Sequence, residues 1–276
     1  MDRSRSALQP HKDQEGHSGA RLQASKPASA QTIPPPIVYT KTRSVTIPLS
    51  VLRHRRVIAA YQKGPFVDAF KILRTQIMQR LRENDWNVLG VTSPGHGEGK
   101  TFTAVNLAVC LAMEAAQTVL LVDANLRNPS VHKVFGLKDC PGLAEFLLDN
   151  ESLEDLLVHP RIGRFVLLPG GRAVSNSTEI LTSPKMLTLV EELKHRYPSR
   201  IVIFDLPPLF FTADVLAFAP YIDALLLVVQ EGKTTLEEVQ RALSLVNNSR
   251  PVLGTVLNKA GELSSTAASM KQLLSL

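Results

Sequence analysis

The sequence predicts an α/β fold with a doubly wound, mainly parallel sheet. Three observations support this prediction: short apolar runs alternate with segments of helical periodicity, several of these runs contain no polar residue, and the glycine-rich stretch GHGEGKT separates one run from a helical segment. Strands that alternate with helices need crossover connections, and such connections make neighbouring strands parallel. A strand that is covered on both faces is apolar throughout rather than at every second position.

The apolar runs and the periodic segments give the order of the elements. Strands are predicted at residues 87–91, 118–122, 165–168, 201–204, 224–229 and 252–257, and helices at 66–82, 101–116, 152–157, 183–196 and 234–248. The first helix is identified by one apolar stripe with spacings of four and three, formed by Phe66, Phe70, Leu73, Ile77 and Leu81. Because ligands bind at the carboxyl ends of the strands in such sheets, we expect the loops after Val91, Val122 and Phe204 to meet at one site.

Composition divides the chain into three parts. Residues 1–45 mix Ser, Gln, Lys and Ala with a proline run and show neither helical nor strand periodicity, so we expect a disordered, basic leader. Residues 46–262 are expected to form one nucleotide-binding domain, and residues 263–276 a short tail. A chain of 276 residues with 44% hydrophobic residues can bury a substantial core, which excludes disorder throughout.

The positive charge is concentrated near the N-terminus. The net charge is +6, and ten basic against three acidic residues lie among the first 62, so the remainder is nearly neutral. A nearly neutral domain lacks the basic face that nucleic-acid binding requires, and we predict no nucleic-acid partner. No apolar run approaches the length of about 18 residues that suggests a membrane-spanning helix, and the N-terminus is too polar for a signal peptide. These features predict a cytoplasmic protein.

Cysteine and histidine usage argues against a metal centre built from these residues. Cys110 and Cys140 lie 30 residues apart without a cluster of Cys or His around either, which is typical of reduced, structural thiols. The seven histidines include no pair at the spacing of a zinc site.

The stretch GHGEGKT follows a predicted strand and opens a predicted helix, which is the setting of a phosphate-binding loop. Its backbone N–H groups and the helix N-terminus form an anion cradle, and glycine permits the close approach. A strict motif would have glycine at Pro94, and a purely structural turn is the weaker alternative. The predicted nucleotide-binding residues of this loop are Gly95, His96, Gly97, Glu98, Gly99, Lys100, Thr101 and Phe102, with Lys100 reaching the phosphates and Thr101 binding Mg²⁺.

Two aspartates end apolar strands at the same predicted edge. Asp123 would bind metal, take a proton or pair with Arg127, although an aspartate that caps the next helix is the alternative. Asp205 follows four apolar residues and has the pattern of a carboxylate that holds metal-bound water. Together with the glycine-rich loop, these residues indicate a site for ATP and Mg²⁺.

These motifs resemble those of the bacterial tyrosine kinase family, P-loop ATPases of the MinD/ParA type that act in exopolysaccharide synthesis. The similarity covers residues 45–262 and is greatest to the autokinases of loci that pair exopolysaccharide genes with exosortase-type sorting. It rests on the phosphate loop at 93–101, on LLVDANLR and FDLPP, and on FVLLPGG, STEIL and LNKA in the same order. The segment DAFKILRTQI is similar to the E-x-x-R-x-x-R self-association helix of that family, with Asp68, Lys71 and Arg74 in the motif positions.

The resemblance implies roles for particular residues. Lys100 and Thr101 would bind the phosphates and Mg²⁺, and Asp123 would accept the tyrosine proton or bind the metal. Asp205 would be the second metal-site acid, and Asn258 would contact the adenine unless it is a simple turn residue. Arg127 is a further predicted nucleotide-binding residue. The implied partners are further copies of this chain, joined through the helix with Asp68, Lys71 and Arg74, and a membrane polysaccharide copolymerase that recruits the protein to the inner face of the membrane.

Several positions depart from the family pattern. The family has D-x-D where this chain has Asp123, Ala124 and Asn125, which predicts weaker Mg²⁺ binding or a weaker base. Leu206 stands where threonine is usual. Gly95 stands where the ParA/MinD branch has its signature lysine, which disfavours a filament or positioning ATPase.

The family's C-terminal cluster of tyrosines is not found in this sequence. The four tyrosines are scattered, at Tyr39, Tyr61, Tyr197 and Tyr221. Two functions therefore remain open. One is an ATP-dependent tyrosine kinase that acts on another protein or on Tyr39 or Tyr61. The other is a non-kinase P-loop ATPase, a nucleotide switch that controls assembly of a membrane polysaccharide copolymerase.

Overall fold

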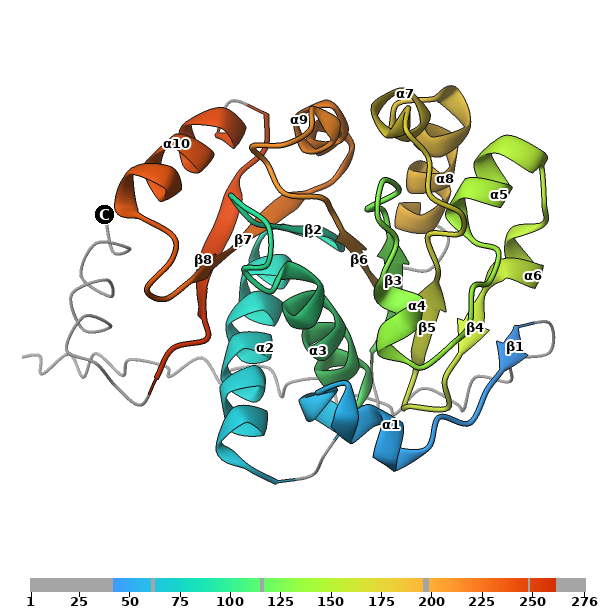
Figure 1. Ribbon diagram of the computed structural model, residues 1–276, viewed down its shortest axis with the longest axis horizontal. Coiled ribbons are helices and arrows are strands. Elements are labelled where there is room, and N and C mark those ends of the chain that lie inside the picture. The colour runs from blue at the N-terminus through green and yellow to red at the C-terminus, as the bar shows by residue number, and fades with distance from the viewer. Residues whose placement is uncertain (1–41, 61–62, 115–116, 196–198, 248, 262–276) are drawn as a thin grey trace, which may run out of the picture. The chain divides into compact units, whose positions relative to one another are not determined.

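Eight strands form one sheet in the order β1-β4-β5-β3-β6-β2-β7-β8 (Figure 1). A computed structural model describes residues 42–60, 63–114, 117–195, 199–247 and 249–261, which all belong to the unit Ile33–Leu276. The strands are β1 (Arg43–Ser44), β2 (Val88–Thr92), β3 (Thr118–Asp123), β4 (Val158–His159), β5 (Phe165–Leu168), β6 (Arg200–Asp205), β7 (Ala224–Gln230) and β8 (Val252–Asn258). Paired strands are parallel except β4 and β5, so the predicted doubly wound, mainly parallel sheet is confirmed.

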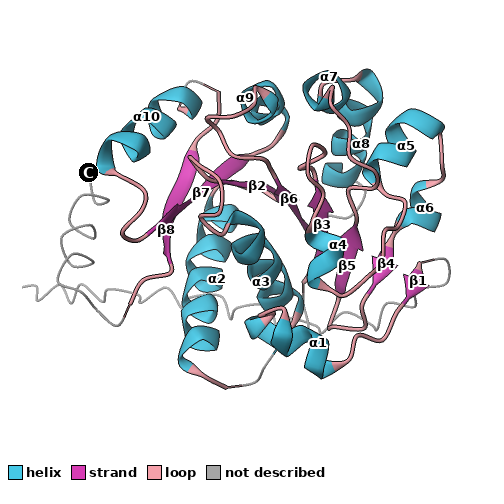
Figure 2. Cartoon of the chain, viewed as in Figure 1, coloured by secondary structure: helices cyan, strands magenta, loops and turns pink. Residues whose placement is uncertain are grey.

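Helices cover both faces of this sheet (Figure 2). They are α1 (Leu49–His54), α2 (Pro65–Glu83), α3 (Lys100–Ala112), α4 (Val131–Val134), α5 (Leu143–Asp149), α6 (Leu153–Leu156), α7 (Ser177–Leu181), α8 (Pro184–His195), α9 (Asp214–Phe218) and α10 (Leu236–Val246). Short 3₁₀ turns lie at Ile58–Ala60 and Ala219–Tyr221. Within the described residues, no helix has the length and hydropathy that crossing a membrane requires.

The strand residues alternate between two hydrophobic cores. Along β3, Val119 and Leu121 pack in the core beneath α2 and α3, whereas Leu120 and Val122 pack in the core shared with α8, α9 and α10. Both cores exclude water, and therefore an uninterrupted apolar strand is stable at the centre of the sheet.

The predicted elements are found, with small changes in their bounds. All six predicted strands form, and the helix predicted at 66–82 is α2, which begins with Pro65 in its first turn. The helix predicted at 101–116 ends at Ala112. The sequence did not predict β1, β4, α1, α4, α5, α7 and α9, because most elements of two to seven residues show little or no period.

The predicted domain boundaries fall partly outside the described residues. Residues 1–41 of the predicted leader and the predicted tail 263–276 lie there. The end of the predicted leader was assigned wrongly, because Arg43 and Ser44 pair with Val158 and His159 as strand β1. Two residues with charged or polar side chains carry no hydrophobic pattern, so their backbone pairing was not visible in the sequence.

Candidate active site

The candidate site lies at the carboxyl ends of β2, β3 and β6, which are neighbours at the centre of the sheet. Asp123 and Asp205 are paired in register at the ends of β3 and β6. Both carboxylates are fully buried. The glycine-rich loop follows β2, so the three loops that were predicted to meet come from adjacent strands.

The glycine-rich loop has the backbone that an anion cradle needs. Gly97 and Gly99 have φ angles of +75° and +101°, a region that side chains with a Cβ rarely adopt. At Gly99, moreover, a Cβ atom would lie 1.9 Å from Asn258 Nδ2. Helix α3 begins directly afterwards at Lys100, so its free N–H groups face the loop.

The Glu98 side chain supports the glycine-rich loop from inside. Its side chain is buried, and one carboxylate oxygen accepts a hydrogen bond from the Gly95 N–H at 2.6 Å. The other oxygen accepts a hydrogen bond from the Thr234 hydroxyl. The carboxylate of Glu98, which was predicted to bind nucleotide, therefore braces the turn.

Lys100, Thr101 and Asp205 form one polar cluster. The Thr101 hydroxyl donates a hydrogen bond to Asp205 Oδ2 at 2.7 Å, and Lys100 Nζ lies 3.6 Å from Asp205 Oδ1. Among the described residues, Asp205 Oδ1 has no hydrogen-bond partner. Burial raises the pKa of Asp205, and the nearby Lys100 and Thr101 oppose that rise. A buried carboxylate oxygen without a donor, beside a hydroxyl, fits the oxygen ligands that Mg²⁺ prefers.

Asp123 is held by backbone amides. Its Oδ2 accepts hydrogen bonds from the N–H groups of Ser130 and Val131 at 2.8 and 2.9 Å, at the start of α4. Burial and the neighbouring charge of Asp205 raise the pKa of Asp123 to about 7. The capping contact considered from the sequence is thus present, and the raised pKa also suits a proton acceptor near neutral pH.

Arg127 does not pair with Asp123, which was one of the predicted alternatives. Its Nε instead donates a hydrogen bond to Ser177 Oγ at 2.9 Å and lies 3.9 Å from Asp214 Oδ2. Nearby, the Asn125 amide donates to the Asn128 carbonyl oxygen at 3.2 Å. Both Asn125 and Arg127 line a cavity of about 310 Å³ together with Lys100 and Thr101.

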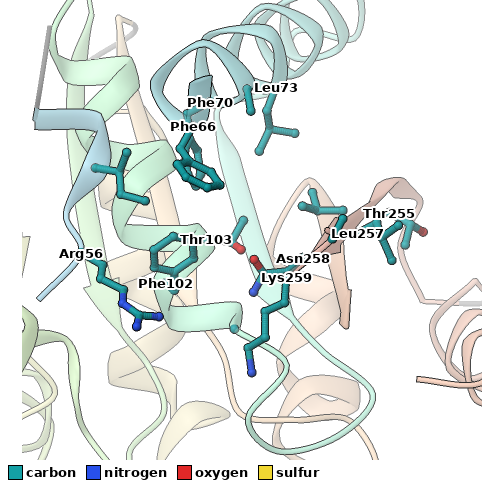
Figure 3. A pocket seen from close by; sticks show the side chains of 15 residues that line it. Arg56, Phe66, Phe70, Leu73, Phe102, Thr103, Thr255, Leu257, Asn258 and Lys259 are labelled. Atoms are coloured by element: carbon teal, nitrogen blue, oxygen red, sulfur yellow. The ribbon is translucent and has the colours of Figure 1, made fainter. Parts of the chain in front are cut away.

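A larger, apolar cavity of about 750 Å³ adjoins the other end of the glycine-rich loop (Figure 3). Phe66 and Phe70 of α2 and Phe102 of α3 line it, and the Phe70 and Phe102 rings meet edge to face with centroids 5.8 Å apart. Asn258 lies at its border and donates a hydrogen bond to the Glu98 carbonyl oxygen at 2.8 Å. The walls are mostly apolar, and Asn258, Arg56 and Lys259 are among the polar residues that line the cavity.

Two lysines that the sequence did not indicate as site residues hold the outside of the loop. Lys259 Nζ donates to the Gly97 carbonyl oxygen at 2.9 Å, and Lys233 Nζ donates to the His96 carbonyl oxygen. The LNKA match contained Lys259, but no pattern marked Lys233. On the same rim, the His96 ring packs on Phe211, which is 60% exposed.

The predicted self-association residues do not form one free surface. Asp68 and Lys71 are exposed and pair with each other at 3.0 Å. Arg74 pairs with Glu114 of the same chain at 2.8 Å and donates to the Cys110 carbonyl oxygen. Arg74 therefore already has an acidic partner within the subunit.

Leu206, which departs from the family pattern, belongs to the second core. It is fully buried, and its N–H donates to the Val91 carbonyl oxygen at 2.9 Å. A Cβ atom at Gly90 would lie 2.8 Å from a Leu206 methyl group, so the two positions fit each other. Leu206 fills the core beneath the site instead of adding a hydroxyl to it.

Comparisons with known proteins agree with this geometry. The sequence model of the AAA domain family matches residues 88–258. The chain is 34% identical to the tyrosine-protein kinase YwqD of Bacillus subtilis over 206 residues, which are 74% of this chain and 86% of that protein. It is 29% identical to the tyrosine-protein kinase ptk of Acinetobacter johnsonii over 193 residues, or 70% of this chain, but spans just 26% of that longer protein.

Solved structures show the same relation. The chimerical protein CapA2B2 superposes with a TM-score of 0.69 at 28% identity, over 80% of this chain and 94% of that one. The MinD protein of Pyrococcus horikoshii, in complex with Mg-ADP, superposes with a TM-score of 0.54 at 22% identity, over 67% of this chain and 76% of that one, which confirms the predicted fold type alone. The family resemblance found in the sequence is confirmed: the chain belongs to the bacterial tyrosine-protein kinases of the P-loop AAA domain family.

Proposed function

We propose that this chain transfers the γ-phosphoryl group of ATP to a tyrosine hydroxyl and so regulates exopolysaccharide synthesis or export. One observation carries the proposal: Asp123, with a pKa raised to about 7, lies beside the cluster of Lys100, Thr101 and Asp205 at one edge of the sheet. A proton acceptor is thus next to the groups that bind phosphate and metal. This is the arrangement that phosphoryl transfer to a hydroxyl requires.

Each part of the site has a role in this reaction. The loop amides and Lys100 bind the phosphates, while Asn258 and the apolar cavity beside it receive the adenine. Thr101 and Asp205, whose Oδ1 accepts no hydrogen bond from the described residues, would hold Mg²⁺, which would supply positive charge against the phosphate oxygens. Asp123 receives the tyrosine proton, while its hydrogen bonds from Ser130 and Val131 keep the carboxylate in place.

The partners follow from the family resemblance and from exposed groups on α2. A membrane polysaccharide copolymerase would recruit the chain to the inner face of the membrane. Copies of the chain would associate through the α2 face that presents Asp68 and Lys71, next to Ile72, which is 61% exposed.

The assembly proposal can be tested by mass measurement with light scattering at increasing protein concentration in the presence of ATP and Mg²⁺. Reversing the charge of Lys71 with Lys71→Glu should shift the protein from oligomer to monomer. Arg74→Ala tests the third motif residue separately, because Arg74 already pairs with Glu114 of its own subunit. An unchanged mass in both variants would refute the role of this face.

A second candidate function is a P-loop ATPase that acts as a nucleotide switch. Asn125 favours it, because this side chain brings an amide, hydrogen-bonded to Asn128, to the place where the family has a second carboxylate. One fewer negative charge next to the metal site weakens Mg²⁺ binding or the base, and so disfavours transfer to tyrosine.

The experiment that separates the two functions uses the purified chain with γ-labelled ATP and Mg²⁺, alone and with a tyrosine-containing polymer. ADP and phosphotyrosine are counted in parallel, and Lys100→Ala serves as the control. Phosphotyrosine that disappears in the control supports the kinase. ADP release without phosphotyrosine, again lost in the control, supports the switch and refutes the kinase.

A further inference from the structure

Arg127 is the second basic side chain of the phosphate cavity, after Lys100. Its side chain is 44% exposed, and its Nε is bonded to Ser177. Within the described part of the chain, its two terminal nitrogens have no hydrogen-bond partner. We propose that Ser177 and Asp214 are positioning residues that orient Arg127 toward the transferred phosphoryl group. This inference deepens the proposed function and rests on it.

The hydrogen bonds around Ser177 have a fixed direction. Ser177 Oγ donates its one hydrogen to Asp214 Oδ2 at 2.6 Å. Because its hydrogen is already donated to Asp214, Ser177 Oγ can act only as an acceptor toward a second partner. It accepts a hydrogen bond from Arg127 Nε at 2.9 Å. The carboxylate of Asp214 therefore determines how the serine, and through it the guanidinium, is oriented.

Asp214 is suited to this task because it is fully buried. A buried carboxylate is costly unless donors and an opposite charge surround it. Hydroxyls of Ser177 and Thr178 supply the donors, and Arg127, with its Nε 3.9 Å away, supplies the charge. Ser177 and Thr178 lie in the STEIL stretch of the family resemblance, which implied no role for them. No sequence pattern indicated Asp214.

The backbone reinforces the side-chain contacts. The N–H of Val174, just before α7, donates to the Leu126 carbonyl oxygen at 2.9 Å, which fixes the loop that carries Arg127. On the other side, the N–H of Phe210 donates to the Pro94 carbonyl oxygen at 3.2 Å and joins the segment before α9 to the glycine-rich loop. Helices α7 and α9 begin at Ser177 and Asp214, so both positioning residues stand on element ends that are anchored to the site.

The geometry also indicates what Arg127 binds. A guanidinium with its Nε engaged still presents two terminal nitrogens as a fork, which suits two oxygens of a phosphoryl group. A fixed cation stabilises charge on the transferred group without reorganising during the reaction. Lys100 pairs with Asp205 at the inner end of the site, so Arg127 is a second cation for the terminal phosphate, in addition to Lys100.

The test compares Ser177→Ala with Thr178→Ala. Both variants remove a hydroxyl that binds Asp214, but Thr178 has no hydrogen bond to Arg127. Calorimetry would measure the affinity for ADP and for a non-hydrolysable ATP analogue, each with Mg²⁺. Ser177→Ala should weaken the analogue about tenfold and leave ADP within about twofold, as expected for a lost hydrogen bond that orients a charged group. Thr178→Ala should change neither.

Two further variants complete the test. Arg127→Ala should show the same selective loss, and adding Ser177→Ala to it should have no further effect, because the two residues act as one unit. Arg127→Lys changes a side chain that is 44% exposed, so we expect the variant to fold. It keeps the positive charge but not the two terminal nitrogens of the guanidinium, and should also lose the preference for the ATP analogue over ADP. Equal weakening of ADP and the analogue, or equal effects of Ser177→Ala and Thr178→Ala, would overturn the proposal. This readout requires no transfer to tyrosine, so absence of phosphotyrosine would refute the kinase without deciding the role of Ser177.

Discussion

The ends of β3 and β6 carry the same residue in the same register, yet the two surroundings differ. Asp205 lies against a cation and a hydroxyl, and its Oδ1 accepts no hydrogen bond from the described residues, whereas Asp123 is held by backbone amides and lies next to the negative charge of Asp205. Both are fully buried, so burial does not separate them. The partners do, and in the proposed reaction they suit Asp205 to metal binding and Asp123 to accepting a proton.

Removing the carboxylate of Asp205 should have the largest effect. Asp205→Asn replaces the anionic carboxylate with a neutral amide, so the proposed Mg²⁺ site loses a charged ligand and we expect turnover to fall about a thousandfold. Titration of activity with Mg²⁺ would check this, because a large rise in the metal concentration needed is the expected signature. An unchanged metal dependence would mean that Asp205 is not a metal ligand.

The matching change on β3 should spare the metal. Asp123→Asn keeps the shape but cannot take the tyrosine proton, and we expect turnover to fall about a hundredfold with the same Mg²⁺ dependence. Steady-state kinetics of phosphotyrosine formation would measure it. If the metal dependence shifted as much as in Asp205→Asn, the distinction between the two carboxylates would be wrong.

The pKa of Asp123 predicts two opposite pH dependences. Turnover should rise with pH and level off above about 7, because the carboxylate must lose its proton before it accepts another. The free energy of unfolding should change in the opposite direction as the pH rises. The folded pKa lies above the ordinary value of 3.8, so the folded state binds more protons, and the free energy of unfolding should fall between about pH 4 and pH 7. Urea unfolding of the wild type and Asp123→Asn would test this, since the variant should lose that part of the decrease.

Restoring the second carboxylate of the family pattern should have the smallest effect. Asn125→Asp adds negative charge near the metal site, and we expect turnover to rise about tenfold or less, with a lower Mg²⁺ requirement. The measurement is the initial rate at limiting Mg²⁺. No change would show that a second carboxylate is dispensable beside Asp123 and Asp205.

The central elements were predictable because they repeat a pattern. Six apolar strands and the long helix α2 are visible as runs and periods, and Lys100, Thr101, Asp123 and Asp205 follow them at strand ends. Glu98 and Leu206 show the limit of that approach. Glu98 stands in the phosphate motif but turns its carboxylate inward, and Leu206 stands at the site position but fills the core. Motif position specifies where the backbone passes, whereas side-chain direction depends on neighbours distant in the sequence.

The sequence by itself determined the doubly wound sheet, the glycine-rich loop and the two carboxylates that meet at its edge, because apolar periodicity and local backbone requirements lie within short segments. Only the tertiary structure decided that Arg74 pairs within its own chain and that Arg127 turns to Ser177 and Asp214 instead of Asp123. It also decided that burial and the charge of Asp205 raise the pKa of Asp123 to about 7. Those outcomes depend on distances between residues 40 to 87 positions apart, and on the desolvation that packing imposes, which no local pattern contains.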